Sequence, residues 1–346
     1  MLSEFALIDR CFKRPTRHTV LGVGDDGALI APTPGQQLVI STDLLVEGTH
    51  FLADTDAEAL GWKVLAVNVS DLAAMGAQPR WATLAIALPG FSEAAADPAA
   101  GFAQPAGYAG AQQCSAKPLL RPPPTVDWIE SFARGFFDCA ERHGIDLIGG
   151  DTTRGPRAFC VTILGEVPPG QALRRDGAQP GDSIWVSGRP GRAALGLAHL
   201  QGRIALAEPG LTTCLAALHR PQPRVALGLA LRGIASAAID VSDGLLADLG
   251  HILEQSGVAA RLQIPGLPGA GRERDCLLAG GDDYELVFTA AAALDNDIAA
   301  LAGELELPLT RIGGIVAGPP GGQTLCDDSG IDITPATRGY DHFQCD

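Results

Sequence analysis

Short runs of β-branched and aliphatic residues recur along the chain and predict its strands. These runs are LVIST at 38–42, FCVTILGEV at 159–167, SIWVSG at 183–188, AAIDVS at 237–242 and YELVFTA at 284–290. Because segments with helical patterns lie between them, we expect an α/β or α+β fold. A turn-rich stretch at 168–182 separates two halves that each contain strands and helices. We therefore expect an N-terminal domain of residues 1–167 and a C-terminal domain of residues 168–346.

One helix is predicted at 55–74, where Thr55 and Glu58 form a capping box. Its apolar stripe consists of Leu60, Val64 and Val67. The next helical step places Asp71 on the same stripe. A carboxylate on an apolar face is costly unless a cation or hydrogen-bond donors meet it, so Asp71 is a candidate functional residue.

A second helix is predicted to begin at Asp127, again with an acid three residues later, and to end before Gly144. A predicted strand, IDLIGG, follows it and leads directly into Asp151. Between the two helices, residues 91–125 are dominated by Ala, Pro and Gly and show no stable periodicity. We interpret them as a mobile insertion closed by a proline run. The alternative is a structured excursion that the pattern does not reveal.

The composition is that of a folded protein, with 46% hydrophobic and 19% charged residues among 346. The 25 Lys and Arg against 40 Asp and Glu give a formal charge of −15, which repels phosphate backbones. We therefore expect no nucleic-acid partner. The chain has no apolar run of membrane-spanning length, and its start, MLSEFALIDR, lacks the plan of a secretion signal. We expect a cytoplasmic protein without a membrane partner.

Acidic residues stand where predicted strands end in glycine-rich turns. They are Asp25 and Asp26 in GVGDDGA, Asp43 in STDLLVEGTH, Asp151 in GGDTTR, Asp240 and Asp243 in DVSDGL, and Asp282 and Asp283 in GGDDYEL. Glycine lets the backbone approach a bulky ligand, and open sheets bind ligands at the ends of their strands. Carboxylate oxygens suit Mg²⁺, which usually shares its coordination with substrate phosphates. We therefore predict a magnesium-bound polyphosphate as the ligand.

Each candidate residue also has a structural interpretation, which the sequence leaves open. Asp243 can cap the helix that follows it, and Asp26 can stabilise a turn. Arg175 is either a bidentate phosphate contact or a surface charge. His50 is either a hydrogen-bonded structural residue or part of a site. Tyr340 either packs the C-terminal tail or forms an aromatic lid.

Convergence of these acids would require cations, because their mutual repulsion otherwise costs several kcal/mol. Catalysis of phosphoryl transfer would then be mainly positioning and charge neutralisation, without a covalent intermediate. A substrate phosphate is already largely ionised near neutral pH, its second pKa being about 6, so no strong general base is required.

Taken together, the motifs resemble those of the thiamine-monophosphate kinase family. Its superfamily includes aminoimidazole ribonucleotide synthetase and selenophosphate synthetase. The resemblance spans nearly the whole chain, and the order and spacing of the motifs are more specific than any one of them. They are FALIDR, GVGDDGA, STDLLVEGTHF, GWKVLAVNVSDLAAMGAQP, GGDTTRG, RRDGAQPGD, VSGRPG, DVSDGLLADL, GGDDYELVF and GYDHF.

The resemblance implies an N-terminal α/β domain whose mixed sheet pairs across a homodimer, with ATP bound near that interface. A C-terminal α/β domain would close the site. The implied reaction converts ATP and thiamine monophosphate to ADP and thiamine diphosphate, the last step in making that cofactor, by direct in-line transfer. The implied partners are these two substrates, with several Mg²⁺ ions.

The resemblance also implies roles for particular residues. The Mg²⁺ ligands, some acting through backbone oxygens or water, correspond to Asp26, Ser41, Thr42, Asp43, Asp71, Asp151, Asp240 and Asp243. The ATP contacts correspond to Gly150, Asp151, Arg175 and Ser242. The contacts to thiamine phosphate correspond to His50, Asp282 and Tyr340. Among these we expect Asp43, Asp71, Asp151 and Asp243 to be catalytic, by holding metal.

Two positions depart from the family pattern. Asp282 stands where the family usually has Glu, and Ala133 stands where a tyrosine near the nucleotide is often found. Two rival hypotheses therefore remain at this point. One is another ATP-using member of the superfamily that acts on a different small phosphate. The other is a non-catalytic protein that binds nucleotide or thiamine phosphate.

Overall fold

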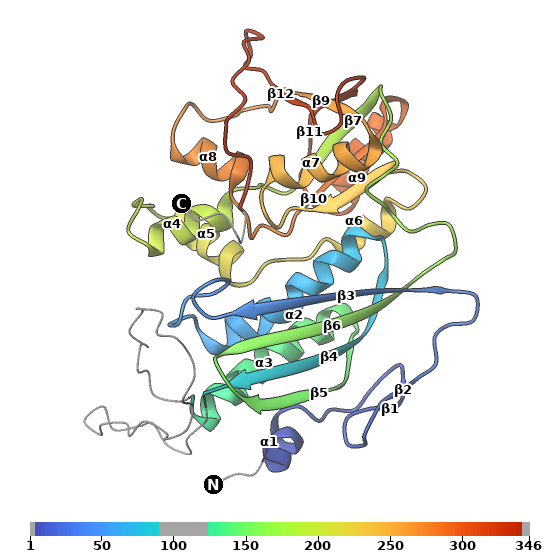
Figure 1. The fold of residues 1–346 in the computed structure, drawn as a ribbon, viewed down its shortest axis with the longest axis vertical. Coiled ribbons are helices and arrows are strands. Elements are labelled where there is room, and N and C mark those ends of the chain that lie inside the picture. The colour runs from blue at the N-terminus through green and yellow to red at the C-terminus, as the bar shows by residue number, and fades with distance from the viewer. Residues whose placement is uncertain (1–3, 90–123, 341–346) are drawn as a thin grey trace, which may run out of the picture.

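Two large β-sheets, one in each half of the chain, organise the fold (Figure 1), and a small two-stranded sheet precedes them in the sequence. The computed structural model describes residues 4–89 and 124–340. All but the last two residues of the insertion predicted at 91–125 therefore lie outside the described residues. The expectation of a mixed α/β fold with two sheet domains is confirmed. The domain boundary between residues 167 and 168 stays a prediction. The strands of one large sheet precede it and those of the other follow it.

The N-terminal half contains a four-stranded sheet in the order β3-β6-β4-β5. Strands β4 and β5 are parallel and the other pairs are antiparallel. Helices α2 and α3 cover one face of this sheet, and Figure 1 shows them behind it. The described elements are α1 (Glu4–Cys11), β1 (Thr19–Leu21), β2 (Leu29–Ile30), β3 (Gln37–Val46), α2 (Ala57–Ala74), β4 (Gln78–Leu88), α3 (Val126–His143), β5 (Asp146–Arg154) and β6 (Ala158–Val167).

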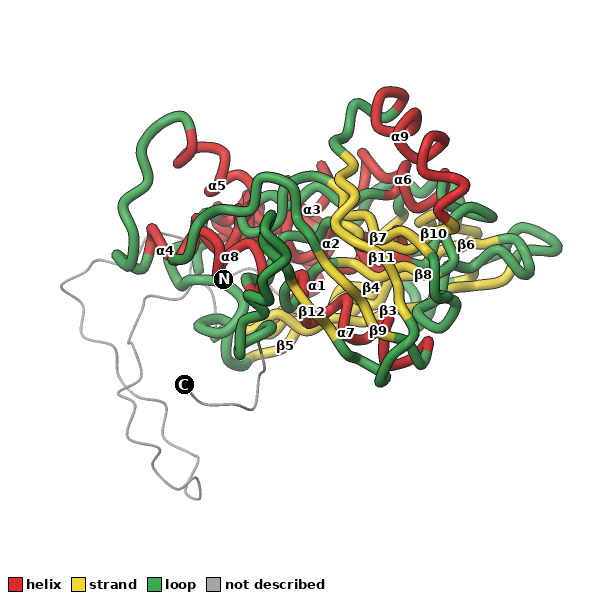
Figure 2. The backbone as a smooth tube through the Cα atoms, turned by 90° about the horizontal axis from the view of Figure 1, so that it is seen from above, coloured by secondary structure: helices red, strands yellow, loops and turns green. Residues whose placement is uncertain are grey.

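The C-terminal half contains a six-stranded sheet in the order β12-β9-β11-β7-β10-β8. Figure 2 shows α6 and α9 on one side of these strands and α7 on the other. The described elements are β7 (Asp182–Ser187), α4 (Arg192–Leu200), α5 (Gly210–His219), α6 (Val225–Ala230), β8 (Ala237–Asp240), α7 (Leu245–Ser256), β9 (Ala259–Leu262), α8 (Arg272–Ala279), β10 (Leu286–Ala291), the 3₁₀ turn η1 (Ala292–Leu294), α9 (Asp295–Glu304), β11 (Leu309–Val316) and β12 (Gln323–Leu325).

The five runs of β-branched and aliphatic residues that predicted strands all form strands, but some begin or end at other residues than predicted. The run at 284–290 begins as a strand only at Leu286, because Tyr284 has a left-handed φ of 53°. The run at 237–242 ends at Asp240, where the backbone enters a turn. Among the described residues, no helix combines the length and the apolar character needed to cross a membrane.

The caps of both predicted helices were placed at the wrong residue. Helix α2 is capped by Asp56, whose Oδ1 accepts the N–H of Ala59 at 2.9 Å, and not by Thr55, whose backbone is used in the preceding turn. Helix α3 is capped by Thr125, which accepts from Trp128, and not by Asp127. In both cases the sequence offered two suitable neighbouring side chains, and the direction of the incoming chain selected one.

Helix α2 is buried on all sides, which the single predicted stripe underestimated. Every residue from 60 to 70 is buried, against the sheet and α3 on one side and against α6 and β8 of the C-terminal half on the other. Its C-terminal Ala74 belongs to a core cluster of the C-terminal domain, together with Phe288 and Leu231. The helix therefore joins the two halves.

Two glycines allow α2 and α3 to approach at backbone distance. A Cβ placed on Gly135 would lie 1.7 Å from the carbonyl oxygen of Glu58, and one on Gly61 would lie 1.9 Å from that of Phe132. Real Cβ atoms do not come so close to a backbone, so neither position accepts a larger residue without moving a helix.

Gly135→Ala is expected to lower the free energy of unfolding by about 3 kcal/mol or more, because overpacking forces two helices apart. Gly303→Ala is the matched control, since a Cβ at that glycine of α9 meets nothing within 4 Å. Alanine there is expected to stabilise the helix by up to about 1 kcal/mol. Thermal unfolding followed by circular dichroism checks both, and equal melting temperatures would contradict the close-crossing interpretation.

Candidate active site

The centre of the site is formed where β3 passes α2. Along β3 the odd-numbered side chains face the helix, so Ser41 and Asp43 lie on the side of Asp71. Ser41 Oγ donates a hydrogen bond to Asp71 Oδ2, and the backbone N–H of Asp43 donates to Asn68 Oδ1 at 3.1 Å. Strand and helix periodicity thus bring two residues far apart in sequence into one cluster.

A third carboxylate reaches this cluster from the C-terminal domain. Asp240, the last residue of β8, is 5% exposed and accepts a hydrogen bond from Ser70 Oγ at 2.7 Å. Burial raises its pKa well above the usual value, and the negative charge of Asp71 raises it further. The acid on α2 is therefore close to one acid from each domain.

These carboxyls are held at an electrostatic cost. Burial, followed by repulsion from Asp71, raises the pKa of Asp43 to about 7. Burial also raises the pKa of Asp71, although the Ser41 hydroxyl and the positive charge of Arg175 oppose that rise. A group of oxygen donors that resists ionisation is what a divalent cation would relieve.

Within residues 4–89 and 124–340, no three His, Cys, Asp or Glu side chains are arranged to hold a metal ion by themselves. The cluster nevertheless fits Mg²⁺ in its donor chemistry, because that ion binds through one or two carboxylates and completes its shell with water and substrate phosphates.

A pocket of about 350 Å³ between the two domains contains this cluster. It brings together most of the residues that the sequence proposed. These are Asp43, His50, Asp71, Asp240, Ser242, Asp243, Asp282 and Tyr340. They come from β3, the turn after it, α2, the turn after β8, the loop before β10 and the C-terminal segment. We refer to this cavity as the acidic pocket.

The turn after β8 is shaped by Asp248, a residue that the sequence analysis missed. Its Oδ2 accepts the backbone N–H groups of Ser242, Asp243 and Gly244, each at 3.0 Å. The cap of α7 is Gly244, so the interpretation of Asp243 as a helix cap is wrong, and its side chain lines the pocket instead. The sequence signal that could have revealed Asp248 is its position in the first turn of a helix, just after a glycine-containing turn.

The neighbouring acids Asp282 and Asp283 have different environments. Asp283 is buried and accepts the N–H groups of Gly191 and Ala193 at the start of α4, which is a structural role. Asp282, with a left-handed φ of 73°, turns toward the pocket. Its Oδ2 accepts from Lys63 Nζ at 2.6 Å.

His50 and Tyr340 lie at the rim of the acidic pocket. His50 Nδ1 accepts the N–H of Val46 at 3.0 Å, so in the neutral ring the proton is on Nε2. The backbone N–H of Tyr340 donates to the carbonyl of Asp243 at 2.9 Å, and its residue is 55% exposed. The C-terminal segment is therefore attached to the turn that carries Asp243.

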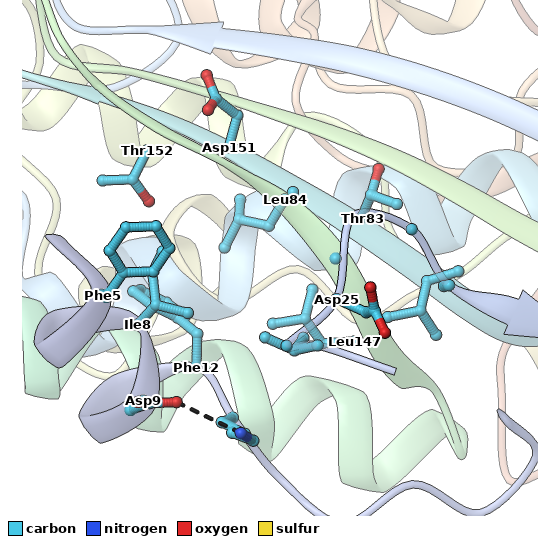
Figure 3. Close-up of a pocket in the computed structure, with 18 of the residues that line it drawn as sticks. Phe5, Ile8, Asp9, Phe12, Asp25, Thr83, Leu84, Leu147, Asp151 and Thr152 are labelled. Atoms are coloured by element: carbon cyan, nitrogen blue, oxygen red, sulfur yellow. Dashed lines mark ion pairs between the residues drawn. The ribbon is translucent and has the colours of Figure 1, made fainter. Parts of the chain in front are cut away.

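A second pocket, of about 750 Å³, lies beside β5 and α1 and is shown in Figure 3. It collects Asp26, Gly150 and Asp151, together with the aromatic rings of Phe5 in α1 and Phe12 just beyond it. Figure 3 shows Asp151 above Thr152 and Leu84. Gly150 has φ 153° and a Cβ there would lie 1.8 Å from the carbonyl oxygen of Leu84, so only glycine fits.

The two pockets lie at opposite edges of the four-stranded sheet. Asp43 on β3 is in register with Val161, Val161 with Leu84, and Leu84 with Gly150 on β5. Three strand spacings separate the outer two backbones, which is about 14 Å. The sequence grouped these residues in one site, whereas the structure of one chain distributes them over two pockets.

Three other predicted residues line none of the pockets. Ser41 supports Asp71 through its hydroxyl. The side chain of Thr42 lies on the opposite face of β3 from Asp43 and shares a hydrogen bond of 2.9 Å with Thr162. Arg175 is exposed, and its charge reaches Asp71. Ala133 is buried in the N-terminal core, away from both pockets.

The chain matches two family models. One is described as AIR synthase related protein, N-terminal domain, and matches residues 24–117 and 95–167. The other is described as AIR synthase related protein, C-terminal domain, and matches residues 179–324. Between them they cover the four-stranded sheet, nearly all of the six-stranded sheet and most of the residues that line the two pockets.

Individual relatives point to one branch of these proteins. The chain is 41% identical to the thiamine-monophosphate kinase of Salmonella typhimurium strain LT2, over 98% of each chain. A solved structure of thiamine-monophosphate kinase from Stenotrophomonas maltophilia K279a is 46% identical and has a TM-score of 0.76, covering 94% of this chain and 97% of its own.

A structure described as AaThiL complexed with AMPPCP and TMP is 28% identical, with a TM-score of 0.69, and covers 99% of this chain and 97% of its own. The similarity to named kinases covers nearly the whole chain, whereas each domain model matches one half of it. The chain belongs to the thiamine-monophosphate kinase family.

Proposed function

We propose that this protein transfers the γ-phosphoryl group of ATP to thiamine monophosphate, giving ADP and thiamine diphosphate in the synthesis of that cofactor. The observation that carries the proposal is the acidic pocket, in which Asp43, Asp71 and Asp240 converge from both domains in a chain of this family. AMPPCP, a nucleotide analogue, and TMP are the ligands in the related AaThiL complex.

Phosphoryl transfer between these two substrates requires no residue that acts as a strong base. A phosphate oxygen of thiamine monophosphate attacks the γ-phosphorus, the new P–O bond forms in line with the breaking bond, and ADP leaves. The acceptor phosphate is already largely ionised near pH 7, since its second pKa is about 6. The protein therefore has to position two anions and balance their charge.

In the acidic pocket, Mg²⁺ would be held by Asp43, Asp71, Asp240 and Asp243, with the oxygens of Ser41 and Thr42 as further ligands. Asp26 and Asp151 would hold metal at the second pocket. When bound, it would neutralise the charge on the transferring phosphate. The carboxyls whose pKa values are raised in its absence would then ionise without repelling one another. Asp248, through its three backbone hydrogen bonds, fixes the turn that presents Asp243.

Each of the two substrates would contact its own set of residues. Gly150, Asp151, Arg175 and Ser242 would contact ATP, and His50, Asp282 and Tyr340 would contact the thiamine phosphate. Both pockets have volumes in the range of about 300–1,000 Å³ that small-molecule sites occupy. Because the reaction consumes ATP, we place the protein in the cytoplasm.

A homodimer is supported by the uncovered face of the N-terminal sheet. Leu38, Ile40 and Leu44 alternate along that face of β3 and are 39%, 59% and 54% exposed. An exposed apolar row on a sheet is typical of an interface.

The function is tested by incubating the purified protein with ATP, Mg²⁺ and thiamine monophosphate and measuring ADP and thiamine diphosphate by chromatography. Equal amounts of both products, abolished by EDTA, are expected. ADP without thiamine diphosphate would indicate an enzyme that uses another acceptor. Nucleotide binding with neither product would indicate a non-catalytic binding protein.

Asp43→Asn is expected to lower kcat by about 100-fold or more while the fold is kept, because a metal ligand contributes several kcal/mol to charge stabilisation. The same change should stabilise the metal-free protein. The pKa of the Asp43 carboxyl is about 7 in the folded state and 3.8 ordinarily, so the folded protein holds this proton more tightly than the unfolded chain does. The carboxyl therefore lowers the free energy of unfolding as the pH rises from about 4 to about 7, and asparagine does not.

The advantage of Asp43→Asn in free energy of unfolding should therefore grow by about 3 kcal/mol between pH 5 and pH 8 in EDTA. Thermal unfolding at both pH values measures it. Asp328→Asn, at an exposed position outside both pockets, is the control and should show no such growth. Normal turnover by Asp43→Asn with full metal supply would contradict the assignment.

Ile40→Glu is expected to convert a dimer to a monomer, because a charge would be buried in the proposed interface. Light scattering after size-exclusion chromatography gives the mass of each species. Val316→Glu, which places the same charge at a 40% exposed position of the C-terminal sheet, should leave the mass unchanged. A wild-type monomer, or a dimer that survives Ile40→Glu, would rule out this interface.

A further inference from the structure

Lys63 is a buried cation that none of the assigned roles uses. It lies on α2, is 3% exposed, and its ammonium group contacts Asp282 Oδ2 at 2.6 Å. A buried lysine is costly unless a carboxylate or other acceptors meet it. It lies eight residues before Asp71, about 12 Å away along the axis of α2. The helix thus presents a positive group at one end of the site and a negative group at the other.

Asp282 is held at both of its oxygens. Oδ2 accepts from Lys63, and Oδ1 accepts from the hydroxyl of Tyr284 at 3.0 Å. The two donors come from different domains, since Lys63 is on α2 and Tyr284 is two residues after Asp282 in the loop before β10. With both oxygens fixed and a left-handed φ of 73° at its backbone, the carboxylate has one orientation.

Asp282 stands at the boundary between two cavities. Besides the acidic pocket, it lines a smaller cavity of about 90 Å³ together with Lys63, His219 and Gln201. The two cavities also share Thr49 and His50. Its side chain remains 27% exposed, so lone pairs of the fixed carboxylate are available to a ligand that enters from either side.

Among the described residues lining these two cavities, Lys63 is the only lysine or arginine. The charge of Lys63 therefore balances that of Asp282 and leaves the carboxyls of Asp43, Asp71 and Asp240 without a direct cationic partner among these lining residues. An ion pair presents a carboxylate to a ligand as a hydrogen-bond acceptor of reduced net charge. Such an acceptor distinguishes ligands by the donors that they place against it.

Resting on the proposed function, we infer that Lys63 and Tyr284 are positioning residues that hold Asp282 for recognition of the acceptor substrate. They set the affinity for thiamine monophosphate and not the affinity for ATP. Asp282 is one methylene shorter than the Glu that the family usually has at this position, and the two donors hold its carboxylate toward the acceptor substrate. A merely structural ion pair between the domains would instead contribute to stability alone.

The test measures KM for each substrate, kcat and the melting temperature of the full chain. Lys63→Met and Tyr284→Phe are each expected to raise KM for thiamine monophosphate about 10-fold, with KM for ATP nearly unchanged, because each removes one fixed bond to a carboxylate. In the Asp282→Asn background neither substitution should raise it further, since both act through Asp282. Lys63→Arg, which keeps the charge, should restore part of the affinity.

Arg80→Met is the matched control, because it breaks another ion pair, with the buried Glu166, that lines neither cavity. It should lower the melting temperature and leave both KM values unchanged. If Lys63→Met fails to fold, Tyr284→Phe carries the test, as it removes a single hydroxyl. Wild-type KM for thiamine monophosphate in both variants would overturn the inference.

Calorimetric titration with thiamine monophosphate makes the same comparison without turnover. A wild-type protein that binds this ligand but forms no thiamine diphosphate would overturn the proposed kinase activity alone, and the variants would still be compared by Kd. An active wild type whose variants bind the ligand equally well would overturn the positioning role alone.

Discussion

The burial of α2 is the constraint on which the rest of the structure depends. An eighteen-residue helix enclosed by a sheet, a second helix and the C-terminal domain can carry polar side chains only where each has a partner. Its polar residues accordingly reach outward to other elements, Lys63 to Asp282, Ser70 to Asp240 and Asp71 to Ser41. The site is assembled from these partners, so the packing of the two domains and the chemistry of the pocket have one origin.

The same burial explains the electrostatics. Away from water, the carboxyls around Asp71 resist ionisation, and hydrogen bonds from serine hydroxyls offset only part of that cost. Divalent cations can relieve the repulsion among these carboxyls and also neutralise phosphate groups, which suits an enzyme that must bring two anionic substrates together. The tight crossing of α2 and α3 at Gly61 and Gly135 gives the helix the rigidity to hold these groups in place.

Much of the fold and of the acidic pocket could be predicted from the sequence. The strands, both long helices and the two-sheet class follow from periodicity, and the acid of α2 was detectable as a carboxylate on an apolar stripe. Applied to Lys63, the same reasoning would have found the other buried charge, since it stands among apolar residues between Leu60 and Val67. Helix caps and strand ends were less predictable, because adjacent residues such as Thr55 and Asp56 can both cap a helix.

The sequence by itself determined which residue types stand at the turns, the family to which their order belongs, and hence the reaction. Only the tertiary structure decided which acid faces the pocket. Asp282 and Asp283 are neighbours of the same type, and their roles separate because the backbone reverses between them toward different partners. Likewise, strand register places Asp43 and Gly150 at opposite sheet edges. Local periodicity contains no information about such pairing, because it depends on contacts between segments distant in the chain.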